Sequence, residues 1–116
     1  MKIYNQPRCS GKTTRLIRES AMKQIPILCT DITHVSFILE SAKEMGLSIP
    51  KPISADYLMF EDRDEYGKNV RPAQISEATK NGVLIDEALT IFKMFLWDAG
   101  VCIDKIDSVT LTYPEE

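Results

Sequence analysis

The feature that most constrains this chain is a glycine-containing turn near its start, in the stretch NQPRCSGKTT at residues 5–14. A short strand candidate, KIYN at 2–5, runs directly into this stretch. The segment TTRLIRESAMKQ at 13–24 follows, with apolar residues at helical spacing. Because α/β folds are built from strands that pass through short turns into helices, the beginning of the chain predicts that class.

The remaining sequence continues this alternation of strands and helices. Apolar runs at 25–30 and 83–88 predict buried strands, and helical patterns cover 33–45, 73–82 and 89–100. Strands that alternate with helices in this way usually form a parallel sheet. We therefore expect an α/β fold with a three-layer core, in which helices flank a largely parallel sheet.

Four other segments have weaker patterns. LSIPKPIS at 47–54 carries two prolines, which predicts a short strand or an edge strand. ADYLMF at 55–60 predicts a brief helix, and the charged stretch EDRDEYGKNVRP at 61–72 predicts an exposed loop. VCIDKIDSVTLTY at 101–113 predicts one or two closing strands.

Length and composition fit one ordinary domain over residues 1–116, with a hydrophobic content of 44% that is enough for a core. The formal net charge of −3 does not favour direct nucleic-acid binding, because domains that bind nucleic acid usually carry a basic excess. No apolar run approaches the roughly 18 residues of a membrane span, and the N-terminus lacks a signal-peptide pattern. We therefore expect no membrane association.

Cysteine usage indicates a reducing compartment. Cys9, Cys29 and Cys102 are odd in number, and no pair has C-x-x-C spacing. This pattern fits neither a disulfide scaffold nor a zinc site, so we expect a cytoplasmic protein. His34, the single histidine, lies at a predicted helix start, and we interpret it as a surface or capping neighbour rather than a ligand.

The helix predicted at 89–100 is strongly apolar and contains Phe92, Phe95, Leu96 and Trp97. Core packing is the expected role of most of these side chains. One exposed face of the helix is a candidate partner surface.

The glycine turn has the composition of a phosphate-binding loop, G-x-x-x-x-G-K-[ST]. Gly11, Lys12 and Thr13 supply its second half, whereas Gln6 stands where the first glycine would be. Consecutive amides at a helix start bind phosphate, and glycine lets the backbone approach closely. Lys12 is placed to reach the β- and γ-phosphates, and the Thr13 hydroxyl to bind Mg²⁺. The amides expected to face the phosphates belong to Cys9, Ser10, Gly11, Lys12, Thr13 and Thr14.

The residues from Ser10 to Thr14 also fit an ordinary helix start. Ser10 can cap a helix, and Gly-Lys-Thr-Thr is unremarkable in composition. The strand candidate before the turn and the amphipathic helix after it favour the phosphate-binding interpretation, because the motif requires that context.

A second motif, VLIDEA at 83–88, places two acids at the end of an apolar strand. In ATPases with a phosphate-binding loop, an acid at this position holds the Mg²⁺ shell. Asp86 has that place, and Glu87 is placed to orient the attacking water. A solvated acidic helix start is the alternative, since acids favour the first turn of a helix. The occurrence of both motifs in the correct chain order favours the catalytic interpretation.

Together, NQPRCSGKTT and GVLIDEA resemble the P-loop NTPases that have an additional strand and a catalytic glutamate beside the Walker B aspartate. The loop is similar to the deviant Walker A of viral large terminase subunits and small phage-encoded ATPases, which reads Arg-x-x-Gly-Lys-[Ser/Thr]. Arg8, Gly11, Lys12 and Thr13 match that form. The resemblance implies a P-loop NTPase-like core, Mg²⁺ with ATP, and a γ-phosphate role for Arg8, for which a surface loop arginine is the alternative.

The resemblance also implies a polar residue that senses the γ-phosphate at the end of the next core strand. In DSVTLTY at 107–113, either Thr110 or Thr112 has that place. Threonine is equally an ordinary strand residue. The resemblance further implies the host cytoplasm, if the chain is phage-encoded, and a process in phage or host DNA metabolism.

Two functions remain open. The first is a small Mg-dependent ATPase, with Lys12, Glu87 and Arg8 catalytic and with Thr13 and Asp86 on the metal. The second is a catalytically weak scaffold, which acts as a protein-interaction module or a nucleotide-dependent switch. The missing first glycine and the small size favour the second function. The retention of Lys12, Thr13, Asp86 and Glu87 together favours the first, which is the one we expect.

A protein partner or self-association could complete the site. Arg63, Lys68 and Arg71, in the loop at 61–72, could reach a neighbour's nucleotide. A solvated loop is the simpler interpretation of these residues.

Overall fold

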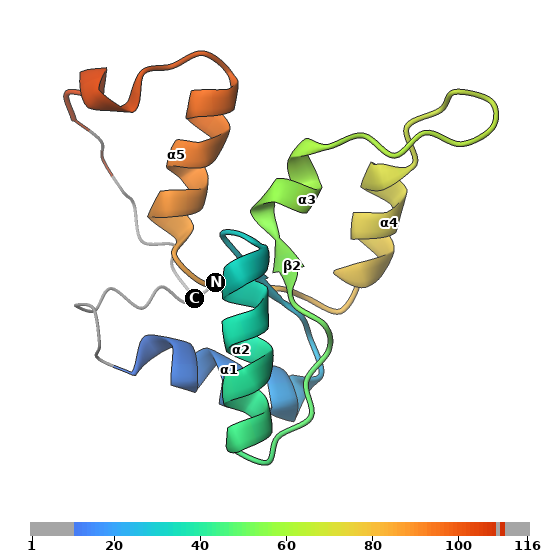
Figure 1. The fold of residues 1–116 in the computed structure, drawn as a ribbon, viewed down its shortest axis with the longest axis vertical. Coiled ribbons are helices and arrows are strands. Elements are labelled where there is room, and N and C mark those ends of the chain that lie inside the picture. The colour runs from blue at the N-terminus through green and yellow to red at the C-terminus, as the bar shows by residue number, and fades with distance from the viewer. Residues whose placement is uncertain (1–10, 109, 111–116) are drawn as a thin grey trace.

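The computed structural model describes residues 11–108 and 110, and it has a mixed α/β fold (Figure 1). The described chain alternates helices with short strands, as the sequence predicts. In chain order the elements are α1 (Lys12–Lys23), β1 (Ile27–Cys29), α2 (Ile32–Glu44), β2 (Ile53–Ser54), α3 (Ala55–Met59), α4 (Arg71–Ala78), β3 (Leu84–Ile85), α5 (Ala88–Asp98) and the 3₁₀-helix η1 (Ile103–Lys105). The predicted strand at 2–5 lies outside the described residues.

The three described strands form one parallel sheet in the order β2-β1-β3. Leu28 is aligned with Ile53 on one side and with Ile85 on the other. β2 therefore lies at the edge of the described sheet, as the two prolines before it predict. The parallel arrangement follows from the helical connections, α2 between β1 and β2, and α3 with α4 between β2 and β3.

One face of the sheet carries the core. Side chains alternate along a strand, so Ile27 and Cys29 point to the same face, and both are fully buried there. α1 and α2 pack on this face and against each other. The core cluster consists of Leu16, Ile17, Ile27, Cys29, Val35, Ile38 and Ala42.

The opposite face of the sheet is more open among the described residues. Leu28 and Ile53 are half-buried there, and Ile85 is 48% exposed. The helices that pack on the core cluster lie on one side only. A mixed α/β fold with a parallel sheet is confirmed, and the three-layer arrangement stays a prediction.

Local signals explain where the first helices begin and end. Gly11 precedes α1 with a φ of +83°, a left-handed conformation that favours glycine. Near the end of α1, the buried Ser20 hydroxyl donates to the Ile25 carbonyl at 2.6 Å, which ties the helix to β1. Asp31 caps α2, because its carboxylate accepts from the His34 amide at 2.9 Å.

The C-terminal part of the described chain differs from the sequence prediction. Residues 101–108 contain η1 and no strand, so the expected strand is wrong over that stretch. The rest of the predicted closing strand falls on residues 109 and 111–113, which lie outside the described residues.

Helix α5 is also packed differently from the prediction. Ile91 is its single buried residue, whereas Phe92, Phe95 and Trp97 are exposed and Leu96 is half-buried. The expected core role of these side chains is therefore wrong. The physical reason is that the helix is mostly apolar, and such a pattern does not clearly indicate which side faces the core.

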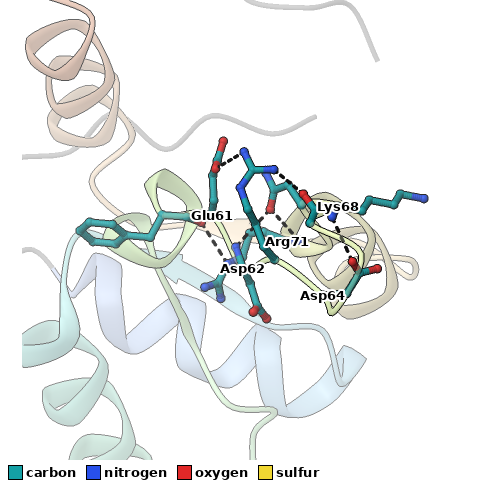
Figure 2. A network of polar contacts seen from close by, with 9 residues as sticks. Glu61, Asp62, Asp64, Lys68 and Arg71 are labelled. Atoms are coloured by element: carbon teal, nitrogen blue, oxygen red, sulfur yellow. Dashed lines mark hydrogen bonds and ion pairs between the residues drawn. The ribbon is translucent and has the colours of Figure 1, made fainter.

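The charged loop between α3 and α4 is exposed, as predicted, and it is closed by its own hydrogen bonds (Figure 2). The Asp64 carboxylate accepts from the amides of Tyr66 and Lys68, and Arg63 bridges to Asn69 across the turn. Arg71 donates to the Phe60 carbonyl. The loop is therefore a short hairpin with defined internal contacts.

None of the helices within residues 11–108 has both the length and the apolar character that crossing a bilayer requires.

Candidate functional site

The two sequence motifs meet at one edge of the sheet. Asp86 directly follows β3, and Thr13 lies in the first turn of α1. The Thr13 hydroxyl donates to the Asp86 Oδ2 oxygen at 3.1 Å, although the two residues are 73 positions apart. In parallel α/β sheets ligands bind at the carboxyl ends of the strands, which is where this pair lies.

A second pair joins the same two motifs. The Lys12 ammonium nitrogen lies 3.9 Å from the Glu87 Oε1 oxygen. Both side chains are partly exposed, so the ion pair itself contributes little stability. Its importance is geometric, because it places the lysine and the second acid of the two motifs side by side.

Glu87 has an unusual backbone conformation. Its φ of +59° and ψ of +50° are left-handed, and few residues other than glycine adopt them. Such strain costs on the order of 1–3 kcal/mol and clusters at functional sites. The turn separates the environments of two consecutive acids, so that the Asp86 side chain is 4% exposed and the Glu87 side chain is 38% exposed.

The start of α1 offers an open approach to a ligand. The backbone of Gly11 is left-handed, and among the described residues no atom beyond its chain neighbours lies within 4 Å of the place where a Cβ would be. Thr14, in the first turn, is exposed. The first amide N–H groups of a helix have no partner within the helix, and they carry a partial positive charge. The N-terminus of α1 therefore favours an anion.

Four other predicted site residues lie outside the described residues, namely Arg8, Cys9, Ser10 and Thr112. Thr110 is described, and it is exposed.

Sequence reasoning missed His34. Its Nε2 atom lies 3.1 Å from the same Asp86 oxygen that Thr13 contacts. Its Nδ1 atom lies 3.3 Å from the Thr30 hydroxyl oxygen. His34 is in the first turn of α2, and Thr30 directly follows β1, so both belong to the same sheet edge as Asp86. Their position at a strand end was visible in the sequence, but the pairing of β1 with β3 was not.

Cys29 lies beside this edge and faces the core. Burial is the main cause that raises the pKa of its thiol from 9.0 to about 11, and the negative charges of Asp31 and Asp86 raise it further. The thiol is thus protonated at neutral pH. It is a core group rather than a nucleophile.

The oxygen atoms of the site fit a hard divalent cation bound together with a ligand. Mg²⁺ holds oxygens at roughly 2.0–2.1 Å in an octahedron, which sets neighbouring ligands about 2.9 Å apart. The Thr13 and Asp86 oxygens are 3.1 Å apart. Over the described ranges no three His, Cys, Asp or Glu side chains gather into a metal-binding group. Thr13 and Asp86 would therefore share the ion with phosphate and water oxygens, as Mg²⁺ sites commonly do.

The loop arginines of the α3–α4 hairpin have partners of their own. Arg63 pairs with Glu61 and donates to the Gly67 carbonyl, and the Arg71 guanidinium carbon lies 3.6 Å from the centre of the Tyr57 ring. Figure 2 shows Arg71 within this network. These contacts favour a self-contained hairpin over a finger that acts on a neighbouring molecule.

Comparisons with protein-family models, with curated proteins and with solved structures found no match to this chain. The geometry of the site is therefore the basis on which a function is inferred.

Proposed function

We propose that this protein binds ATP with Mg²⁺ at the carboxyl edge of its sheet and hydrolyses it, as a small ATPase of the P-loop class. The observation that carries the proposal is the Thr13–Asp86 hydrogen bond of 3.1 Å. It joins the hydroxyl of the phosphate-loop motif to the acid of the strand motif. A chance match of either motif would not require the other to be its neighbour in space.

Each residue of the site has a role in this proposal. The amides from Cys9 to Thr14 and the start of α1 bind the phosphates, and Lys12 neutralises their charge. Thr13 and Asp86 hold the metal ion, whose charge offsets that of the phosphates. Glu87 orients the attacking water.

The ion pair between Lys12 and Glu87 supports these roles. Their 3.9 Å separation keeps the lysine near the acid that would act on the water. A phosphate group that attracts Lys12 would weaken this pair and leave Glu87 able to accept a hydrogen bond from water. The partial exposure of both side chains allows that exchange.

The finer fold belongs to the same proposal. A three-layer P-loop core requires a strand before Gly11, which the stretch at 2–5 would supply, and a helix layer on the face of Leu28 and Ile85. Arg8 would compensate for Gln6 in the place of the first glycine, and Thr112 would contact the γ-phosphate. The process served would be phage or host DNA metabolism in the cytoplasm.

A second function has one observation in its favour. Helix α5 directly follows Asp86 and Glu87 in the chain and has exposed apolar side chains, among them Leu89, Phe92 and Trp97. A nucleotide-dependent switch or interaction module would use such a surface for a protein partner. In this alternative, the protein binds the nucleotide and does not hydrolyse it.

Replacement of Glu87 by glutamine separates these two functions. In a hydrolase, E87Q should lower kcat by about 10²-fold or more, since general-base contributions are of that size. ATP binding should persist, because the substitution removes a negative charge close to the phosphates. E44Q, at the exposed end of α2, is the matched control and should leave both quantities unchanged.

The measurements are phosphate release and ATP affinity on the same preparations. Turnover in E87Q equal to that of the wild type would contradict the catalytic assignment. ATP binding by the wild type without turnover would support the switch function in its place.

A further inference from the structure

His34 makes a contact that the proposed chemistry does not use. Its Nε2 atom and the Thr13 hydroxyl both approach one oxygen of Asp86, each at 3.1 Å. They come from different elements, α2 and α1, so they approach the carboxylate from separate helices. The Asp86 side chain is 4% exposed, so water can contribute little to its hydrogen bonding.

The orientation of the His34 ring is fixed by several neighbours. The amide of the residue is held by the Asp31 cap at the start of α2. The Thr30 hydroxyl faces the Nδ1 atom, and Phe37 contacts the ring edge-on with centroids 6.0 Å apart. The ring therefore has a defined position before any ligand binds.

The contact with the Asp86 carboxylate indicates which nitrogen of the His34 ring carries the proton. A carboxylate oxygen only accepts hydrogen bonds, so the Nε2 atom that faces Asp86 must carry hydrogen. In the neutral ring, Nδ1 is then an acceptor, and the Thr30 hydroxyl donates to it. The result is a hydrogen bond between Thr30 and one ring nitrogen of His34, and a close polar contact of the other ring nitrogen with Asp86.

We propose that His34 is a positioning residue for the metal site, which holds the Asp86 carboxylate in the orientation that binds Mg²⁺. The inference rests on the proposed function, because it assumes that Asp86 serves the metal ion of a bound nucleotide. Groups that hydrogen-bond to metal ligands typically account for 10–100-fold of metal affinity. Without His34, Thr13 would be the one side chain of the described residues left in polar contact with the buried carboxylate, which would then be freer to rotate.

The test compares ATP affinity with saturating Mg²⁺ and with EDTA, by calorimetry on the full chain. The ratio of the two affinities isolates the contribution of the metal ion. In H34A the ratio should fall about 10–100-fold, while the affinity in EDTA stays within about 2-fold of the wild type. H34Q should recover most of the ratio, because the glutamine amide nitrogen reaches about as far as Nε2 and is also a donor.

T30V provides a graded second variant. It removes the hydroxyl that faces Nδ1 and keeps the shape of the side chain, so the ratio should fall less than in H34A. If H34A does not fold, as judged by circular dichroism, T30V and H34Q decide the question.

The outcomes distinguish the inference from the function on which it rests. Wild-type binding with an unchanged ratio in folded H34A would overturn the role of His34 and leave the proposed function intact. An equal loss of affinity with Mg²⁺ and with EDTA would indicate a merely structural residue and would also overturn it. Absence of ATP binding by the wild type would overturn both.

Discussion

Two parts of this molecule are built in contrasting ways. The unit of α1, β1 and α2 contains the whole core cluster, in which Ile17, Ile27 and Ile38 are at most 1% exposed. The unit of α5 and η1 buries Ile91 and leaves Trp97 65% exposed. In the view of Figure 1, α5 stands away from the α1–α2 pair, with α3 and α4 on the other side of α2.

The site lies at the junction of these two units. Lys12, Thr13 and His34 come from the well-packed unit, whereas Asp86 and Glu87 form the turn that leads into α5. The two side chains that contact Asp86, Thr13 and His34, thus both belong to the unit that contains the core cluster. The comparison indicates that the first unit stabilises the fold and positions the site. The second unit contributes mainly exposed side chains.

The largest effect should come from the core of the first unit. Ile38→Ala removes a fully buried side chain and leaves a cavity, so the free energy of unfolding should fall by roughly 2–5 kcal/mol. Urea denaturation followed by circular dichroism measures this change. Ile38→Val should lose about 0.5–1.5 kcal/mol and remains measurable if the alanine variant does not fold.

Trp97→Ala is the matched substitution in the second unit. It removes a larger side chain, yet the exposure of Trp97 predicts a change within about 0.5 kcal/mol. If Trp97→Ala lowered the free energy of unfolding as much as Ile38→Ala, the contrast between the units would be contradicted. It would also indicate that α5 is covered in solution.

A smaller effect concerns the two described cysteines, one in each unit. Cys29 is buried with a thiol pKa raised to about 11, and Cys102 is exposed. A neutral thiol reacts poorly, so alkylation at pH 8 should modify Cys102 quickly and Cys29 only after unfolding. The rate at Cys29 should rise with pH toward 11, as the thiolate forms.

Mass spectrometry of the labelled peptides separates the two cysteines from each other and from Cys9. Urea-unfolded protein is the control, in which both thiols should react. Rapid labelling of Cys29 in the folded protein would contradict its place in the core.

Most of the described fold could be predicted from the sequence. The helices at 12–23 and 32–44 have clear buried faces. The prolines before β2 indicate its edge position. Local periodicity was sufficient in these cases because one face of each element is apolar and the other is polar.

The C-terminal part could not be predicted equally well. Helix α5 is mostly apolar, so its sequence does not show clearly which side packs. VCIDKI contains the β-branched residues that strands favour, yet Ile103–Lys105 form a 3₁₀ turn. Strand formation depends on a partner strand, and a partner is not encoded locally.

The site was predicted in part. The order of the motifs identified Thr13 and Asp86 as candidates, and the structure brings these two residues into contact. His34 was missed because its importance depends on the adjacency of β1 and β3, which places α2 beside Asp86. That adjacency is a property of the topology, and no local pattern in the sequence reveals it.

The measurement that tests the central claim most directly is calorimetric titration of Mg-ATP into the wild type and into Lys12→Ala. Lys23→Ala is the matched control, because Lys23 lies at the other end of α1 and pairs with Glu19. We predict saturable binding in the wild type and in Lys23→Ala, and a loss of about 10-fold or more in Lys12→Ala, of the size expected for a charged hydrogen bond. No binding by the folded wild type, or equal binding by all three proteins, would contradict a phosphate site at the start of α1.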